Sequence, residues 1–160
     1  MVDYVRYYDR ERYLFEDVHQ RFHAEQSVGA FDFFSIVIWK ANRAKSKIAH
    51  RLQAKATPAH GDLDMIVRRL TASLYQAPDH RERLRLLLQD WGFLLPMASA
   101  ILAVFWPDDF TIYDTRVCDQ LKRYEELAGW SNFERVWQGY CEYRGAVRSA
   151  VSNELPLRDK

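Results

Sequence analysis

The stretch of sequence that decides the fold is Trp91-Gly92-Phe93-Leu94-Leu95-Pro96-Met97-Ala98-Ser99-Ala100-Ile101-Leu102. A glycine is followed by a proline and then by small and apolar residues, which predicts a tight turn that leads into a buried helix. A second stretch, Phe110-Thr111-Ile112-Tyr113-Asp114-Thr115-Arg116, predicts a short loop that brings an aspartate to the start of another helix. Together the two stretches predict a turn, a helix rich in small residues, a loop and a capped helix, in that order.

The rest of the chain also has the spacing of helices. Apolar residues recur every three or four positions, and the 6 glycines and 5 prolines lie mostly between the periodic segments. We therefore expect an all-α fold of about eight helices in a single domain, residues 1–160. The expected helices cover residues 9–25, 31–39, 42–52, 62–75, 81–89, 97–105, 114–127 and 131–149, with a linker at 57–61.

Several helix ends can be assigned from residue type. Asp62 and Asp114 are expected N-caps, Pro78 suits a first helical turn, and Ser131 with Glu134 forms a capping box. Asn42 either caps the helix that follows it or lies at a bend between two continuous helices. Residues 36–39 alone suit a strand, but their helical neighbours favour a helix.

Composition excludes several classes of protein. The net charge is only +1, so binding to nucleic acid requires a local basic patch. Cys118 and Cys141 are far apart, which argues against a disulfide scaffold, a structural zinc site and an iron–sulfur cluster. His19 and His23 have helical spacing but lack an evident third ligand, so we expect no metal and no cofactor. Without a signal sequence or a long apolar run, we expect a cytoplasmic protein that does not enter membranes.

The predicted turn has the chemistry of an anion site. The first N–H groups of a helix have no partner within it and lie at the positive end of the helix dipole, where a phosphate binds well. Gly92 permits a positive φ and a close approach of another chain. On these grounds alone, a corner between two helices with no ligand remains the alternative.

The same residues resemble the helix-hairpin-helix region of the base-excision DNA glycosylase superfamily (HhH-GPD), and most of the chain is similar to a branch of small bacterial proteins within it. The likeness extends to residues 31–40 and the basic run that follows, and Asp114 lies 22 positions after Gly92. The matching segments are Gly92-Phe93-Leu94 in the turn, Ala98-Ser99-Ala100-Ile101-Leu102 in the helix and Ile112-Tyr113-Asp114-Thr115-Arg116-Val117 in the aspartate motif.

The resemblance implies that the backbone of Gly92, Phe93, Leu94 and Leu95 binds a phosphate of double-stranded DNA, and that Asp114 acts on a flipped nucleotide. Cleavage of an N-glycosidic bond builds positive charge on the sugar, which a fixed carboxylate stabilises while it orients water. Two departures matter. Leu94 replaces the second turn glycine, and Pro96 stands where bifunctional members carry a nucleophilic lysine, so the expected activity is monofunctional. A purely capping role is the alternative for Asp114.

Basic and aromatic residues complete the candidate site. Four cations step by three, four and four positions, so one continuous helix would align them on a stripe that follows phosphates, and a solvated helix face is the alternative. Two aromatic residues are candidates for the pocket of the flipped base, with the helix core as their alternative. The cations are Lys40, Arg43, Lys47 and Arg51, and the aromatic residues are Trp39 and Tyr113.

Three functions therefore remain open. The first is a monofunctional DNA glycosylase, the second is a DNA-binding module without chemistry, and the third is a helical interaction or regulatory protein. The target base and any protein partner are not fixed by the sequence. Proteins of the similar branch continue past residue 160, so the resemblance also implies a missing C-terminal extension.

Overall fold

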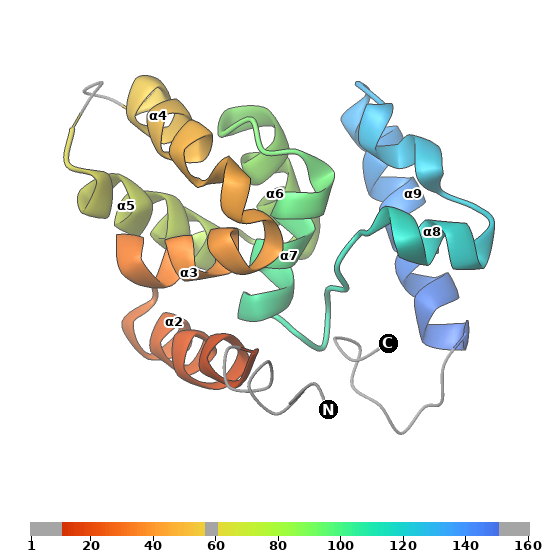
Figure 1. Ribbon diagram of the computed structural model, residues 1–160, viewed down its shortest axis with the longest axis horizontal. Coiled ribbons are helices and arrows are strands. Elements are labelled where there is room, and N and C mark those ends of the chain that lie inside the picture. Colours follow the sequence, from red (N-terminus) through yellow and green to blue (C-terminus); the bar gives the residue numbers. More distant parts are fainter. Residues whose placement is uncertain (1–10, 57–60, 151–160) are drawn as a thin grey trace. The chain divides into compact units, whose positions relative to one another are not determined.

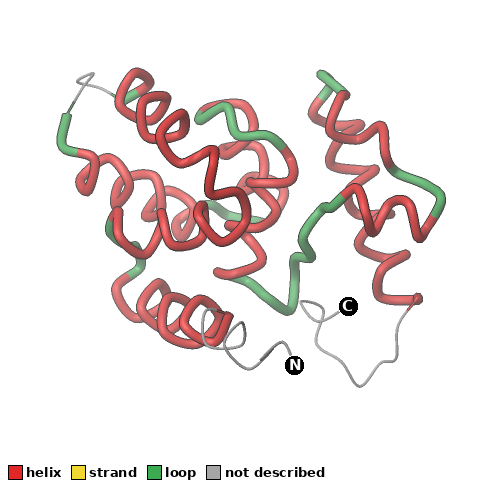
Figure 2. Tube along the Cα trace, viewed as in Figure 1, coloured by secondary structure: helices red, strands yellow, loops and turns green. Residues whose placement is uncertain are grey.

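The computed structural model describes residues 11–56 and 61–150, and every regular element in this part of the chain is a helix (Figure 1, Figure 2). The predicted all-α fold is therefore confirmed. The chain divides after Pro78 into two compact units, which are described one at a time, and the single domain over 1–160 stays a prediction. The expected helix start at Asp9 and the linker residues 57–60 lie outside the described residues, as does the expected C-terminal extension.

The first unit is organised around α3. This helix contacts α4, α5 and the π-helical segment. The elements are the π-helical segment Tyr13–Val18, α2 (His19–Glu25), α3 (Ala30–Ala41), the 3-10 turn Asn42–Ala44, α4 (Lys45–Lys55) and α5 (Leu63–Gln76).

Spacing of apolar residues explains why α3 is central. Phe33, Ile36 and Val37 are fully buried, as expected for residues three and four apart on one helix face. The preference for a helix over a strand at residues 36–39 is therefore confirmed. Phe31 and Ile38 are exposed at 77% and 42%, so the helix is not buried on all sides.

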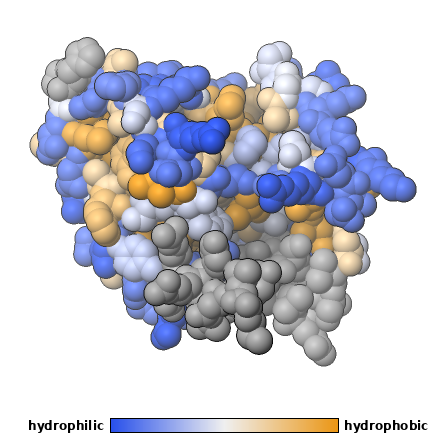
Figure 3. Space-filling view, viewed as in Figure 1, coloured by the Kyte–Doolittle hydropathy of each residue, from blue (hydrophilic) through white to orange (hydrophobic). Residues whose placement is uncertain are grey.

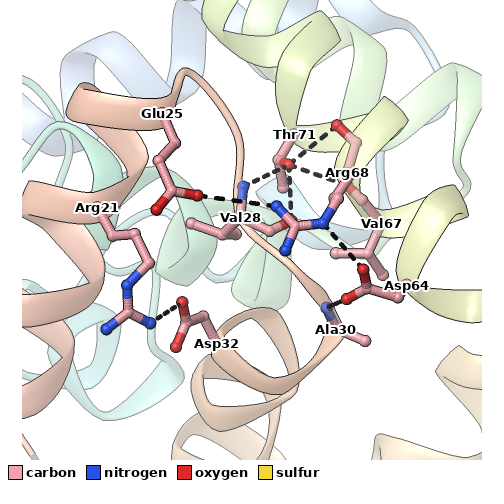
Figure 4. A network of polar contacts seen from close by, with 9 residues as sticks. All are labelled: Arg21, Glu25, Val28, Ala30, Asp32, Asp64, Val67, Arg68 and Thr71. Carbon is pink, nitrogen blue, oxygen red and sulfur yellow. Dashed lines mark hydrogen bonds and ion pairs between the residues drawn. The ribbon is translucent and has the colours of Figure 1, made fainter.

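The link between α2 and α3 is fixed by polar side chains of α5 (Figure 4). Val28 N donates a hydrogen bond to Thr71 Oγ1 at 3.0 Å, and Ala30 N donates to Asp64 Oδ1 at 2.7 Å. Arg68 in turn donates to the second oxygen of Asp64 at 2.9 Å. A link without secondary structure of its own thus has backbone N–H groups satisfied from a neighbouring helix.

A buried carboxylate adds a second polar contact in this unit. Asp32 is only 4% exposed, and its two oxygens accept hydrogen bonds from Tyr13 Oη at 2.6 Å and Arg21 at 2.5 Å. An unpaired carboxylate at this depth would be strongly destabilising, so the two partners explain why it is tolerated.

The second unit is organised around α7, whose apolar composition predicted a buried helix. All of its residues are buried except Pro96, which is half-buried. It contacts α6, the π-helical segment and the 3-10 helix of this unit. The elements are α6 (His80–Arg85), the π-helical segment Leu86–Asp90, α7 (Leu95–Phe105), α8 (Thr115–Leu121), the 3-10 helix Glu125–Gly129 and α9 (Phe133–Ala150).

The start of α6 differs from the prediction. Pro78 lies before the helix rather than in its first turn, because Asp79 is the N-cap. The Asp79 carboxylate accepts a hydrogen bond from Glu82 N at 2.7 Å, which satisfies one of the first N–H groups of the helix.

The start of α9 is also corrected. Its cap is Asn132, whose Oδ1 accepts a hydrogen bond from Arg135 N at 3.0 Å. The predicted capping box of Ser131 and Glu134 is wrong, because the helix begins one residue later and Glu134 forms an ion pair with Arg81.

Candidate functional site

The turn between the π-helical segment Leu86–Asp90 and α7 has the positive φ that the sequence predicted at Gly92. Gly92 has φ 71°, a left-handed conformation that an L side chain rarely adopts. Trp91 N donates to Leu86 O at 3.0 Å, and Phe93 N donates to Leu87 O at 2.9 Å. These two bonds satisfy two carbonyl groups of the final, π-helical turn, and the chain then leaves the helix through a left-handed residue.

This turn limits which amides are left for a phosphate. Phe93 N–H is a correction to the predicted set, because it is bonded to Leu87 O and cannot at the same time point at a ligand. Leu94 is extended and caps α7, so the amides of Leu94 and Leu95 precede the hydrogen-bonded turns of the helix. Pro96 has no N–H, so the amides of Leu94 and Leu95 are the candidates that this turn offers.

The small residues of α7 serve packing, and one of them, Ser99, also holds the aspartate loop. Ala98, Ser99, Ala100 and Ala103 are all fully buried. Ser99 Oγ accepts a hydrogen bond from Tyr113 N at 2.8 Å. A larger side chain at any of these positions would have no space in a close-packed interior.

The loop that leads to Asp114, residues 106–114, contains no helix, and side chains of α9 hold its backbone. Tyr140 and Tyr143 contact the carbonyl groups of residues 111 and 112, at 2.6 and 3.0 Å. Arg144 and Arg148 donate to the carbonyl groups of residues 109 and 108, both at 2.7 Å. These four side chains occupy one face of α9, because they are three, one and four positions apart. None of the four was among the predicted site residues.

Asp114 is the N-cap of α8, as predicted. Its backbone is extended (φ −138°, ψ 135°), and its carboxylate accepts a hydrogen bond from Arg116 N at 2.9 Å. The residue is half-exposed, so the carboxylate is accessible to a ligand while its position is fixed. The catalytic role that the resemblance implied stays a prediction.

Tyr113 is removed from the candidates for a base pocket. Its side chain is fully buried, and its hydroxyl group is shared between Tyr124 O at 2.6 Å and Glu125 O at 3.1 Å. A base cannot stack on a ring that is enclosed on all sides. The same contacts help to explain why α8 ends at Leu121 rather than at the predicted residue 127, since the chain turns back through left-handed Lys122 (φ 54°).

A polar cluster that the sequence analysis also missed lies at the start of the aspartate loop. His80 Nε2 is 3.2 Å from Asp109 Oδ2, and Arg83 lies 2.9 Å from His80 Nδ1. Because a guanidinium is only a donor, Nδ1 is the acceptor and Nε2 carries the proton. Burial lowers the pKa of His80, and the Asp109 carboxylate opposes that shift. The His80 and Phe110 rings pack edge to face, with their centroids 4.9 Å apart.

The four predicted cations lie in the first unit, but they do not share one continuous helix. The helix breaks at Ala41, which has φ −158° and ψ 80°. Lys40 is therefore in α3, Arg43 is in the 3-10 turn, and only Lys47 and Arg51 remain one turn apart on α4. The single stripe is wrong, whereas contact with phosphate stays a prediction. Asn42 also differs from both predictions. Its side chain does not cap α4, and it lies in a 3-10 turn rather than at a bend between two continuous helices. Asn42 Oδ1 instead accepts a hydrogen bond from Lys45 Nζ at 3.1 Å.

The start of α4 is nevertheless a basic surface. Arg43, Lys45 and Lys47 are exposed, the first turn contains no acidic residue, and the surface over α4 is largely hydrophilic in Figure 3. Trp39, in the same unit, is half-buried and contacts Phe15 edge-on with ring centroids 5.7 Å apart. Its role in a base pocket stays a prediction.

Within the part of the chain that the structure describes, no group of three or more His, Cys, Asp or Glu side chains is placed to hold a metal ion. Cys118 is buried and Cys141 is half-buried, and both are free thiols, as expected. Within residues 11–56 and 61–150, no helix has both the length and the apolar character needed to cross a bilayer.

Comparison with known proteins assigns no relative. No protein family, no curated protein and no solved structure matches the chain.

Proposed function

We propose that this protein binds duplex DNA and hydrolyses the N-glycosidic bond of a flipped damaged or modified base, as a monofunctional glycosylase of the helix-hairpin-helix kind. One observation carries the proposal. Asp114 is a half-exposed carboxylate at the end of a loop whose backbone is held by buried side chains. A carboxylate fixed before the reaction begins stabilises the positive charge that develops on the sugar, without reorganisation in the transition state.

The hairpin supports the DNA-binding part of the proposal. Gly92 has the positive φ of a tight turn, and the amides of Leu94 and Leu95 lie at the positive end of α7. A backbone phosphate fits such a site. Pro96 in the first turn offers no amine for a Schiff base, so the strand is left intact after the base is removed.

The basic surface at the start of α4 supports binding to a polyanion. Cations at the N-terminal end of a helix are repelled by the positive end of its dipole, and a bound phosphate offsets this repulsion. We expect Lys47→Ala to reduce the slope of log K against log salt concentration by about 1. A slope that does not change in this variant excludes Lys47 from the interface.

The decisive experiment measures base release from a panel of damaged and modified duplexes. Asn is as good an N-cap as Asp, so Asp114→Asn retains the start of α8 and removes only the negative charge. Asp119→Asn, an exposed residue of the same helix, is the matched control for charge. We expect the wild type and Asp119→Asn to yield abasic sites that break only after alkali, and Asp114→Asn to yield none while it still binds DNA.

The second candidate is a DNA-binding module on the same scaffold without chemistry. The burial of Tyr113 favours it, because this aromatic ring beside Asp114 is not available to a base. Salt-sensitive binding with no product on any duplex would establish this candidate. Absence of both binding and product would leave a helical interaction protein.

A further inference from the structure

We propose that Tyr140 and Tyr143 of α9 are positioning residues for Asp114, because their hydroxyl groups bond the backbone of the loop as a neighbouring β-strand would. The effect on base release rests on the proposed function. The placement of the Asp114 carboxylate does not, and it is tested separately.

Tyr140 contacts both backbone groups of one residue. Its hydroxyl donates to Thr111 O at 2.6 Å and accepts from Thr111 N at 3.1 Å. In an antiparallel sheet, a residue of the adjacent strand makes this pair of contacts with its own N–H and C=O. A single phenol that donates once and accepts once satisfies the same two groups.

Tyr143 continues the pattern one residue closer to Asp114. Its hydroxyl donates to Ile112 O at 3.0 Å. Ser99 Oγ then accepts the N–H of the next residue, Tyr113, at 2.8 Å. From Thr111 to Tyr113, each residue therefore has a backbone group bonded to a side chain of α9 or α7.

The two phenols are also rigid. Tyr140 and Tyr143 are fully buried, with ring centroids 6.2 Å apart, and Tyr143 packs on Tyr113 at 5.2 Å. Burial raises the pKa of both phenols, so each remains protonated and able to donate across the physiological range. Phenylalanine would fill nearly the same space, so packing alone does not require these hydroxyl groups.

The test removes one hydroxyl at a time. Tyr140→Phe and Tyr143→Phe delete the contacts with the loop and retain the rings. Tyr124→Phe is the matched control, because its ring lies against Tyr143 while the described residues offer its hydroxyl no hydrogen bond. Amide hydrogen exchange is measured at Thr111, at Tyr113 and along the buried helix α7, and the carboxyl group of Asp114 is titrated by NMR.

We expect exchange at residues 111 and 113 to accelerate by about tenfold in the two loop variants, relative to α7, and the titration of Asp114 to shift. Neither change is expected in Tyr124→Phe. Uniform acceleration along the whole second unit would mean that the tyrosines only stabilise the fold, and this result would overturn the proposal, as would unchanged exchange at the loop.

Base release provides the second readout. We expect single-turnover release to fall by about tenfold in Tyr143→Phe, with unchanged affinity for duplex DNA, because the loop moves and the hairpin does not. Reduced release with an unchanged Asp114 titration would overturn positioning. If the wild type releases no base, the proposed function fails, and hydrogen exchange still decides whether the tyrosines position Asp114.

Discussion

Thr71 offers a test of how the first unit holds its irregular link. The side chain is fully buried, accepts a hydrogen bond from Val28 N at 3.0 Å and lies 2.9 Å from Val67 O (Figure 4). Thr71→Val has nearly the same shape and leaves the fully buried Val28 N–H without its partner. Leaving a buried donor unsatisfied costs about 1–3 kcal/mol of unfolding free energy. In a chain of this length each kcal/mol corresponds to about 2–4 °C in Tm.

Thr71→Ser is the matched control, because it retains the hydroxyl and removes one methyl group at a cost of about 1 kcal/mol. If the hydrogen bond dominates, valine destabilises more than serine; if packing dominates, the order reverses. Urea denaturation followed by circular dichroism gives both free energies, and hydrogen exchange at Val28 reports the local contact. A valine variant as stable as the serine variant, with Val28 still protected, would refute the reasoning.

The remaining predictions concern α9 and His80. Gly139→Ala should destabilise the protein, because a Cβ there would collide with the Leu127 side chain. Gly145→Ala has open space around it and should stabilise α9 by up to about 1 kcal/mol. Thermal melts that rank the two variants in the opposite order would contradict this description of the packing. Burial lowers the pKa of His80 in the folded state, so below pH 6.5 the unfolded chain binds more protons than the folded one. The contribution of neutral His80 to the free energy of unfolding is therefore fully present above pH 6.5 and is lost as the pH falls below that value. Melts between pH 8 and pH 5 should therefore show a smaller decline for His80→Gln than for the wild type, and an equal decline would exclude His80 as a source.

Local signals in the sequence predicted most helices but not all of their ends. Periodicity and the aspartate caps gave the position of α5 and the start of α8, because these features are properties of a few neighbouring residues. The end of α8 was missed because Lys122 and Tyr124 adopt positive φ values without being glycine, asparagine or aspartate. A contact between the Tyr113 hydroxyl and the backbone of Tyr124 holds this turn, and local residue type does not encode it.

The same distinction between local signals and tertiary contacts applies to the candidate site. Gly92 and the cap at Asp114 followed from residue type, whereas most of the side chains that hold the aspartate loop come from α9, about 30 positions further along the chain. Tyrosines at helical spacing are usually core residues, and these are core residues too. Only the tertiary structure shows that their hydroxyl groups face a backbone that has no strand beside it.

The cap and the proposed catalytic role of Asp114 are compatible. A carboxylate has two oxygens with several acceptor positions, so the bond from Arg116 N does not exhaust its capacity. The first amides of a helix favour a negative charge, and a negative charge is what stabilises a cationic sugar. Capping also fixes the direction of the Asp114 side chain, whereas a carboxylate on a mobile loop would have no fixed direction. Asp114→Asn and Asp114→Ala therefore separate the two roles: asparagine should remove base release and retain α8, whereas alanine should weaken both.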